Sequence, residues 1–194
     1  PLFRPDAAQV DGFGPPPIWL AGVGPAMTRV AGEVADGFLS HPLCPPEFLR
    51  DTTVPTLRSA ATQSERSMPA IHHSAMVIVG HDAAARAEAR EAVRRQIAFY
   101  GSTPAYHPVL ESVGYGDIGP RLHGLSRSGD WTAMAALVDD GLVDAIAVTI
   151  DDPAAGAADL LSRYGDLVDR MGLNTPYAAD PELLAEVGSA VRRS

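Results

Sequence analysis

The chain has 194 residues, of which 46% are hydrophobic and 20% are charged, which suits one folded domain with a sizeable core. Its formal net charge of -9 argues against nucleic acid as a partner, because such an interface needs clustered cations. No stretch approaches the ~18 consecutive apolar residues of a membrane-spanning helix, so no membrane partner is expected.

The basic and sulfur-containing residues narrow the chemistry further. All 15 basic residues are arginine, which excludes a Schiff-base lysine and a P-loop lysine from these residues. Cys44 is the single cysteine, which is consistent with a reducing compartment. With the high alanine content, these features favour a cytoplasmic protein from a GC-rich bacterial genome.

The first elements are predicted from proline, glycine and apolar spacing. Residues 1–16 are rich in proline and glycine and are predicted to form a linker or insertion, so that residues 17–194 hold the folded unit. The apolar run Ile18–Ala21 is typical of a parallel strand that is buried on both faces. Proline suits the first turn of a helix, so a helix is predicted to begin at Pro25. Its apolar face is expected from the i, i+3, i+4, i+7 spacing of Met27, Val30, Ala31 and Val34.

The turn between this strand and this helix has the features of an anion site. Gly22 and Gly24 are expected to let the backbone turn tightly and to leave room for a ligand. The free N–H groups and the dipole of the helix then face the carboxyl end of the strand, where a phosphate is the usual occupant. A phosphate is therefore predicted to bind at Gly22, Val23, Gly24, Pro25, Ala26 and Met27.

Strands and helices alternate along the rest of the chain, which favours an α/β fold with parallel strands. Three further strands are predicted, which brings the total to four: Asp36–His41, Ile71–Gly80 with its buried end at Met76–Val79, and Asp169–Thr175. Four parallel strands neither cover both of their faces nor close into a barrel. The chain is therefore interpreted as half of a larger fold, whose exposed sheet edges would drive association.

The helices are predicted from caps and periodicity. The predicted helices are residues 45–61 with a kink or break at Pro55, a long helix capped by Asp82, residues 131–138, a helix capped by Asp152, and residues 181–192. One face of the long helix is expected to hold Ala89, Val93, Ile97 and Tyr100. Residues 101–130, which include Gly124–Ser128, are predicted to form a loop of the length that often serves as a lid or binding segment.

Five segments together carry a family resemblance: Pro1–Pro5, Pro15–Met27, Ala31–Gly37, Arg95–Tyr106 and Arg163–Gly165. They resemble the luciferase-like monooxygenase superfamily, and within it the branch that uses the deazaflavin coenzyme F420. The resemblance covers nearly all of the chain but only the C-terminal half of the family's (β/α)8 TIM barrel. It implies that residues 17–194 supply about the last four β/α units, with the four predicted strands as barrel strands five to eight.

The resemblance also implies where ligands bind. The family's cofactor phosphate lies near the turn after barrel strand five, which corresponds here to Gly22–Met27. Ligands of such barrels gather at the carboxyl ends of the strands, so the candidates for a substrate or ring pocket are Ser40, His41, Tyr100, Tyr106 and Asn174. The alternative for His41 is a histidine that is hydrogen-bonded to backbone at a strand end, and the alternative for Tyr100 is a core residue. No catalytic residue is assigned.

The function implied by the resemblance is that of an oxidoreductase. Reduced coenzyme F420 would transfer a hydride to or from a small organic substrate, while the protein orients ring and substrate. An FMN-dependent luciferase-like monooxygenase is the first alternative. The second is a non-catalytic half-barrel that binds a phosphorylated ligand or a partner chain, and a homo-oligomer or pairing through the half-barrel edges is expected.

Two other kinds of site are disfavoured. A Rossmann dinucleotide site would need a third glycine where Met27 stands, and an acidic residue where the next strand ends in Ser40 and His41. No metal site is expected, because His72 and His73 are adjacent on a strand and point to opposite faces.

Overall fold

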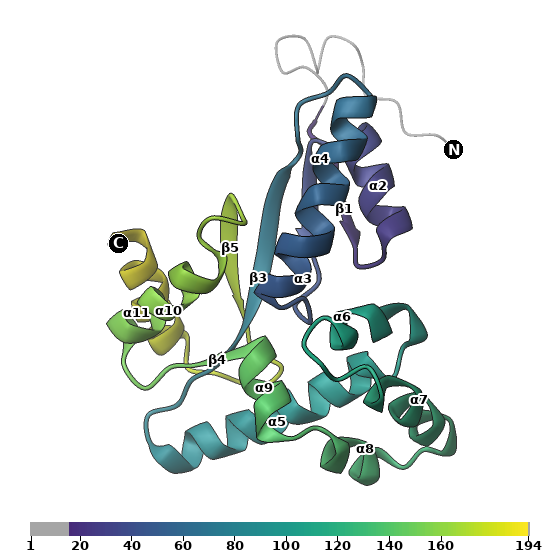
Figure 1. The fold of residues 1–194 in the computed structure, drawn as a ribbon. Helices are drawn as coiled ribbons and strands as arrows, with labels where there is room; N and C mark the ends of the chain where they lie inside the picture. The colour runs from purple at the N-terminus through teal and green to yellow at the C-terminus, as the bar shows by residue number, and fades with distance from the viewer. Residues whose placement is uncertain (1–15, 194) are drawn as a thin grey trace, which may run out of the picture.

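A computed structural model of the chain describes residues 16–193. The predicted linker at residues 1–16 therefore lies outside the described residues, apart from Pro16. Within the described part of the chain, a single sheet of five parallel strands is covered by helices (Figure 1). This is the α/β architecture that the alternating sequence pattern predicts.

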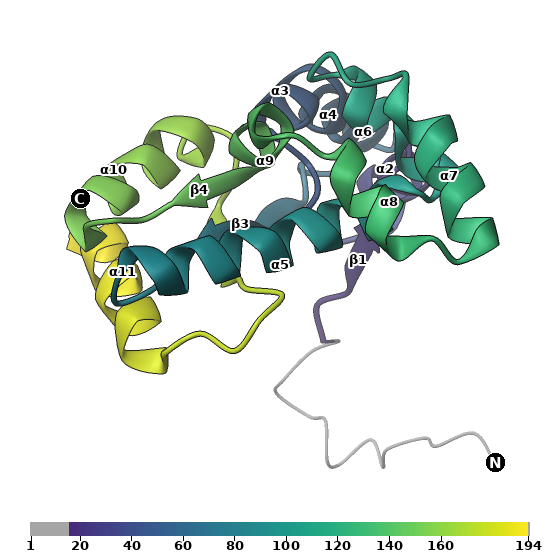
Figure 2. The same ribbon diagram turned by 90° about the horizontal axis from the view of Figure 1, so that it is seen from below.

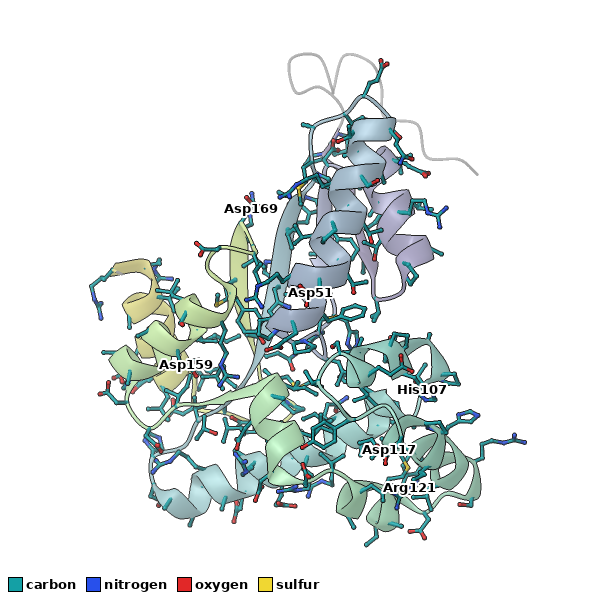
Figure 3. The ribbon with its side chains drawn as sticks, in the orientation of Figure 1. Asp51, His107, Asp117, Arg121, Asp159 and Asp169 are labelled. Carbon is teal, nitrogen blue, oxygen red and sulfur yellow. The ribbon has the colours of Figure 1, made fainter. Side chains whose placement is uncertain are left out.

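The strands follow the chain order along most of the sheet. They are β1 (Trp19–Gly22), β2 (Gly37–Ser40), β3 (Ala70–Ile78), β4 (Ala147–Thr149) and β5 (Arg170–Asn174). β1 pairs with β2 and β2 with β3, while β4 and β5 both pair with β3. The register places Gly22 beside Ser40, and Ser40 beside His73. Asp169 precedes β5 (Figure 3), and its carboxylate accepts the N–H of Ile71 at 2.8 Å, which joins the start of β5 to β3.

Helices connect the strands. They are α2 (Pro25–Val34), α3 (Pro46–Phe48), α4 (Val54–Gln63), α5 (Ala83–Gly101), α6 (His107–Glu111), α7 (Ile118–Ser128), α8 (Trp131–Leu137), α9 (Asp140–Ile146), α10 (Pro153–Tyr164) and α11 (Pro181–Arg193), with a π-helical turn η1 (Leu49–Thr53) and a 3-10 turn η2 (Pro104–Tyr106). Viewed from below, α5 runs along the molecule from the neighbourhood of α11 to that of α8 (Figure 2). Within the described residues, no helix is both long and apolar enough to span a bilayer.

The prediction of four strands is wrong, because β4 is a fifth. Its three residues follow directly on α9, so no turn residue in the sequence separates the helix from the strand. Pairing with the end of β3 makes β4 a strand. Arg90 of α5 strengthens this arrangement, because its guanidinium pairs with Asp140 at 3.0 Å and with Asp144 at 2.7 Å on α9.

The first strand and helix are more exposed than predicted. Ile18 is 56% exposed, and β1 pairs only with β2 among the described strands, so the predicted burial on both faces is wrong. On α2, Met27, Val30 and Val34 are 47%, 40% and 53% exposed, and only Ala31 of the predicted apolar face is buried. α2 instead packs on α4 through its small residues, since Ala31 and Gly32 face that helix.

The irregularity predicted at Pro55 is present as the π-helical turn η1, which joins α3 to α4. Here the N–H of Val54 donates to the carbonyl of Leu49, five residues earlier. Proline has no N–H to give and its ring crowds the preceding turn, so the backbone widens just before Pro55. The helical segment therefore continues to Gln63 rather than breaking.

Residues 101–130 are largely helical, so the predicted loop is wrong. η2, α6 and α7 fill most of this segment, and Gly124–Ser128 lies within α7. One of its glycines lies at a close contact between two helices. A Cβ added at Gly119 of α7 would lie 2.7 Å from Cδ2 of His107 on α6, and Figure 3 labels His107 in this group of helices.

The predicted caps are confirmed. The carboxylate of Asp82 accepts the N–H of Ala85 at 2.8 Å, and that of Asp152 accepts the N–H groups of Ala154 at 3.0 Å and Ala155 at 2.9 Å. These bonds satisfy donors that a helix start leaves without helical partners.

We expect Asp152→Ala to lower the free energy of unfolding by about 1 kcal/mol, because two first-turn N–H groups of α10 lose their acceptor. Urea unfolding of the variant and the parent chain measures this difference. Asp152→Asn is the matched control, since its side-chain oxygen still caps the helix. Equal losses in both variants would contradict the capping role.

Candidate functional site

A pocket lies at the carboxyl ends of β1 and β2, next to the η2 segment. Its volume is about 610 Å³. Three stretches of chain line it: Ala21–Met27 at the end of β1 and the start of α2, Leu39–Pro42 at the end of β2, and Ala105 with Tyr106 of η2. No Asp, Glu, Lys or Arg is among these lining residues. The pocket therefore offers neutral groups only.

The start of α2 supplies backbone donors to this pocket. Gly24 is the N-cap residue, Pro25 is the first residue of the helix, and the N–H of Thr28 donates to the carbonyl of Gly24 at 3.1 Å. The N–H groups of Ala26 and Met27 belong to the first turn, where an α-helix provides no acceptor. They lie with the positive end of the helix dipole at the pocket wall, an arrangement that favours an anion.

The two glycines of the turn have different roles. Neither has a positive φ, so the turn does not need the conformational freedom of glycine at either position. At Gly22 an added Cβ would lie 2.9 Å from Cβ of Met27 and 3.4 Å from the Phe38 ring, so glycine is required for packing. At Gly24 an added Cβ would have nothing within 4 Å. The fold therefore tolerates a side chain at Gly24, and the space beside it is open to a ligand.

His41 stands at the pocket with a defined hydrogen-bonding state. Its Nδ1 accepts the N–H of Leu43 at 3.1 Å, so the proton of the neutral ring is on Nε2. The ring meets Tyr100 edge-on at 4.4 Å between centroids and lies 4.8 Å from the Tyr106 ring. Burial lowers the pKa of His41 to about 4, so the ring is neutral at pH 7. His41 therefore makes the backbone hydrogen bond expected of a histidine at a strand end, and it also lies at the pocket.

The other predicted pocket residues are distributed unevenly. Ser40 and Tyr106 line the pocket with His41. Tyr100 is half-buried behind them, in contact with the His41 and Tyr106 rings rather than on the wall. Asn174 lies at the end of β5 beside Met76 and is not among the lining residues. The structure therefore brings Gly22–Met27, Ser40, His41 and Tyr106 together.

Sequence reasoning missed one residue behind the pocket. His73 of β3 is fully buried, and its Nδ1 lies 2.7 Å from Oγ of Ser40. Its ring packs against Tyr164 at 4.5 Å between centroids. The adjacency of His72 and His73 in the sequence gives no signal of this contact. No group of three or more metal-ligating side chains is found in residues 16–193. Only the register of β2 against β3 brings Ser40 to His73.

The buried histidines predict a loss of stability in mild acid. Burial, with smaller effects of His72 and His41, lowers the pKa of His73 to about 3 from its ordinary 6.5. Between these values the unfolded chain binds a proton that the folded chain does not. The contribution of neutral His73 to the free energy of unfolding is therefore fully present above pH 6.5, and it falls as the pH drops below this value. We expect a decrease on the order of 2 kcal/mol from His73 by about pH 4.5.

Urea unfolding at a series of pH values between about 7 and 4.5 measures this decrease. His73→Asn removes the titrating group and should make the decrease clearly smaller, leaving the share of His41. Carboxylates with lowered pKa values, such as Asp180, lose their contribution at lower pH, so they do not mimic the effect. The same decrease in His73→Asn as in the parent would contradict the assignment.

The fold and the pocket first define a class of protein. Parallel strands joined by helices, with a pocket at their carboxyl ends, are the arrangement of β/α-barrel proteins. A solved structure with this arrangement is the coenzyme F420 dependent tetrahydromethanopterin reductase from Methanopyrus kandleri, with a TM-score of 0.69 at 22% identity. The match covers 91% of this chain and 50% of that one.

The sequence matches the family described as luciferase-like monooxygenase over residues 2–170, and the chain belongs to this family. An uncharacterized protein of Mycobacterium tuberculosis is 44% identical over 174 residues, which are 88% of this chain and 50% of that protein. The F420-dependent glucose-6-phosphate dehydrogenase of Nakamurella multipartita is 39% identical over 54 residues, or 28% of this chain and 16% of that protein. The chain thus spans about half the length of the Mycobacterium tuberculosis protein and of the Methanopyrus kandleri reductase.

Proposed function

We propose that the chain is part of an oxidoreductase that uses coenzyme F420, and that the turn Gly22–Met27 binds the cofactor phosphate. The observation that carries this proposal is the pocket at the start of α2, where Ala26 and Met27 of the first helical turn line the same cavity as Gly24, which has open space beside it. Relatives named for F420 dependence support the choice of cofactor. The single, buried and free Cys44 is compatible with the cytoplasmic location that we propose with it.

The residues of the pocket fit a phosphate without a counter-charge. Backbone N–H groups and the helix dipole supply the attraction, and His41 presents its Nε2–H from the end of β2. The deazaflavin, when bound, would donate a hydride to a small organic substrate from its reduced form or accept one in its oxidised form. The part of this chain is to bind and orient: the α2 start holds the anionic end, and the apolar walls formed by Val23, Met27 and Leu39 exclude water.

FMN is the alternative cofactor, because it also carries a phosphate that such a turn can hold. Fluorescence titrations of the purified chain with coenzyme F420 and, in parallel, with FMN distinguish the two. We expect saturable binding of F420 and weaker binding of FMN. Saturable binding of FMN alone would contradict the choice of cofactor, and binding of neither would contradict the placement of the phosphate site within these residues.

We also propose that further β/α units, of the kind that make up the rest of a luciferase-like barrel, cover the β1 side of the sheet. Met27, Val30 and Val34 are exposed at helical spacing on α2, and Ile18 is exposed next to β1. Exposed apolar surfaces are typical of interfaces. β1 has one hydrogen-bonding edge without a partner among the described strands, and an unpaired edge invites another strand. The relatives, about twice as long as the matched region, contain additional chain to supply such units.

Co-expression tests this pairing. The chain should co-purify with the half of the Mycobacterium tuberculosis relative that it does not match, and a Val30→Glu/Val34→Glu variant should lose the complex, because two charges would be buried at the contact. Trp131→Gln, at an exposed apolar residue on α8, is the matched control and should retain the complex. A stable monomer that binds no such half in sedimentation would refute the proposal.

A further inference from the structure

Ser40 of the pocket wall and His73 behind it form a buried polar pair. Oγ of Ser40 lies 2.7 Å from Nδ1 of His73, and both side chains are buried, His73 completely. On the other side of the ring, Nε2 of His73 is buried and has no partner among the described residues. The ring of Tyr164 packs against the face of the His73 ring, with 4.5 Å between the centroids, and its hydroxyl is likewise buried and unpartnered in the described part of the chain.

This geometry distinguishes the two neutral forms of His73. With the proton on Nε2, the ring would hold a buried N–H donor with no acceptor in the described structure. With the proton on Nδ1, the donor is satisfied by Oγ of Ser40 and only a nitrogen lone pair lacks a partner. Buried unsatisfied donors are rarer in proteins than under-used acceptors, so the second form is favoured. Burial lowers the pKa of His73 to about 3, so one of these two neutral forms is present at pH 7.

The form of His73 decides what Ser40 offers to the pocket. If Oγ of Ser40 accepts a hydrogen bond from the N–H of His73, the hydroxyl hydrogen of Ser40 is left to donate to another acceptor. The acceptor that the described residues provide is the carbonyl of His72 at 3.4 Å, which is a long hydrogen bond. Ser40 lines the pocket, so a ligand oxygen there can take this hydrogen bond instead.

We infer that His73 is a positioning residue that donates from Nδ1 to Ser40 and thereby turns Ser40 into a hydrogen-bond donor for the pocket ligand. His41, which follows Ser40, is fixed in the other neutral form, because its Nδ1 accepts from Leu43 and its Nε2–H is free to donate. With the N–H groups of Ala26 and Met27, the polar part of the pocket becomes an array of neutral donors. Such an array selects an anionic oxygen ligand without a cation. The identity of this ligand rests on the proposed function, whereas the state of His73 does not.

The state of His73 is measured without any ligand. Long-range 1H–15N spectra of the 15N-labelled chain distinguish a protonated from an unprotonated ring nitrogen for each histidine. We expect a proton on Nδ1 of His73 and on Nε2 of His41. A proton on Nε2 of His73 would overturn the inference, whatever the chain binds.

Binding measurements test the consequence for the ligand. Asparagine keeps an N–H donor near the position of Nδ1, so His73→Asn should bind coenzyme F420 nearly as well as the parent chain. His73→Leu and Ser40→Ala should each weaken binding about fivefold to tenfold, and the double variant should be no weaker than either. Ser112→Ala, whose hydroxyl donates to the carbonyl of Val109 away from the pocket, is the control.

Two outcomes of these titrations would overturn the inference. One is an equal loss in His73→Asn and His73→Leu, which indicates a role in packing alone. The other is a double variant whose loss is the product of the single losses, since Ser40 and His73 would then act independently. If the parent chain binds neither coenzyme F420 nor inorganic phosphate, the proposed ligand fails, and the ligand-free spectra alone still decide the state of His73.

Discussion

Replacing Gly24 with tryptophan is expected to weaken binding of coenzyme F420 at least about a hundredfold, or about 2.8 kcal/mol. An added Cβ at this position points into open space, and the backbone of Gly24, with φ of -75°, accepts any residue. The indole therefore fills the pocket in front of the Ala26 and Met27 N–H groups rather than disturbing the fold. The thermal midpoint should stay within a few degrees of that of the parent chain.

Fluorescence titration of the Gly24→Trp variant with coenzyme F420 measures the loss, and circular dichroism confirms the fold. Gly124→Trp is the matched control, because Gly124 of α7 is exposed and an added Cβ there also has nothing within 4 Å. This control should bind as the parent does. Unchanged affinity for coenzyme F420 in Gly24→Trp would contradict the proposal that the phosphate binds at this turn.

The second large effect concerns the contact of α2 with α4. Gly32→Leu is expected to lower the free energy of unfolding by about 3 kcal/mol, at the upper end of the usual range for overpacked cores. An added Cβ at Gly32 would lie 2.7 Å from Cβ of Ala60 and 2.7 Å from the carbonyl oxygen of Leu57. Since one of these atoms is backbone, the two helices must separate to admit a side chain.

Urea unfolding measures this effect, and Gly188→Leu on α11 is its control. A Cβ at Gly188 meets only the guanidinium of Arg192, at 3.8 Å. Leucine is a better helix former than glycine, so this control should be neutral or slightly stabilising. If Gly32→Leu behaved like the control, the close packing of α2 on α4 would be refuted.

The features that sequence predicted well depend on neighbouring residues. Asp82 and Asp152 cap helices through N–H groups two or three residues away, so the motif and its effect lie in the same short segment. The buried end of β3, Met76–Val79, is at most 5% exposed, as its run of apolar residues indicates. Membership in the luciferase-like family was also visible from short motifs.

The features that sequence missed depend on contacts between distant segments. β4 is a strand because β3 lies beside it, and α6 and α7 are helices although glycine and proline interrupt their apolar pattern. The apolar spacing on α2 was real, but it could not show that α4 packs against the small residues instead. Periodicity identifies an apolar face without identifying what covers it.

The candidate site shows the same division. The sequence alone determined that a helix begins at Pro25 after a strand, which defines the candidate anion-binding turn, because the backbone preference of proline acts locally. Only the tertiary structure decided that Ser40, His41 and Tyr106 join that turn around one pocket, and that His73 stands behind Ser40. Strand register and helix packing bring these residues together across tens of residues, and such contacts depend on the summed burial of the whole core rather than on any local pattern.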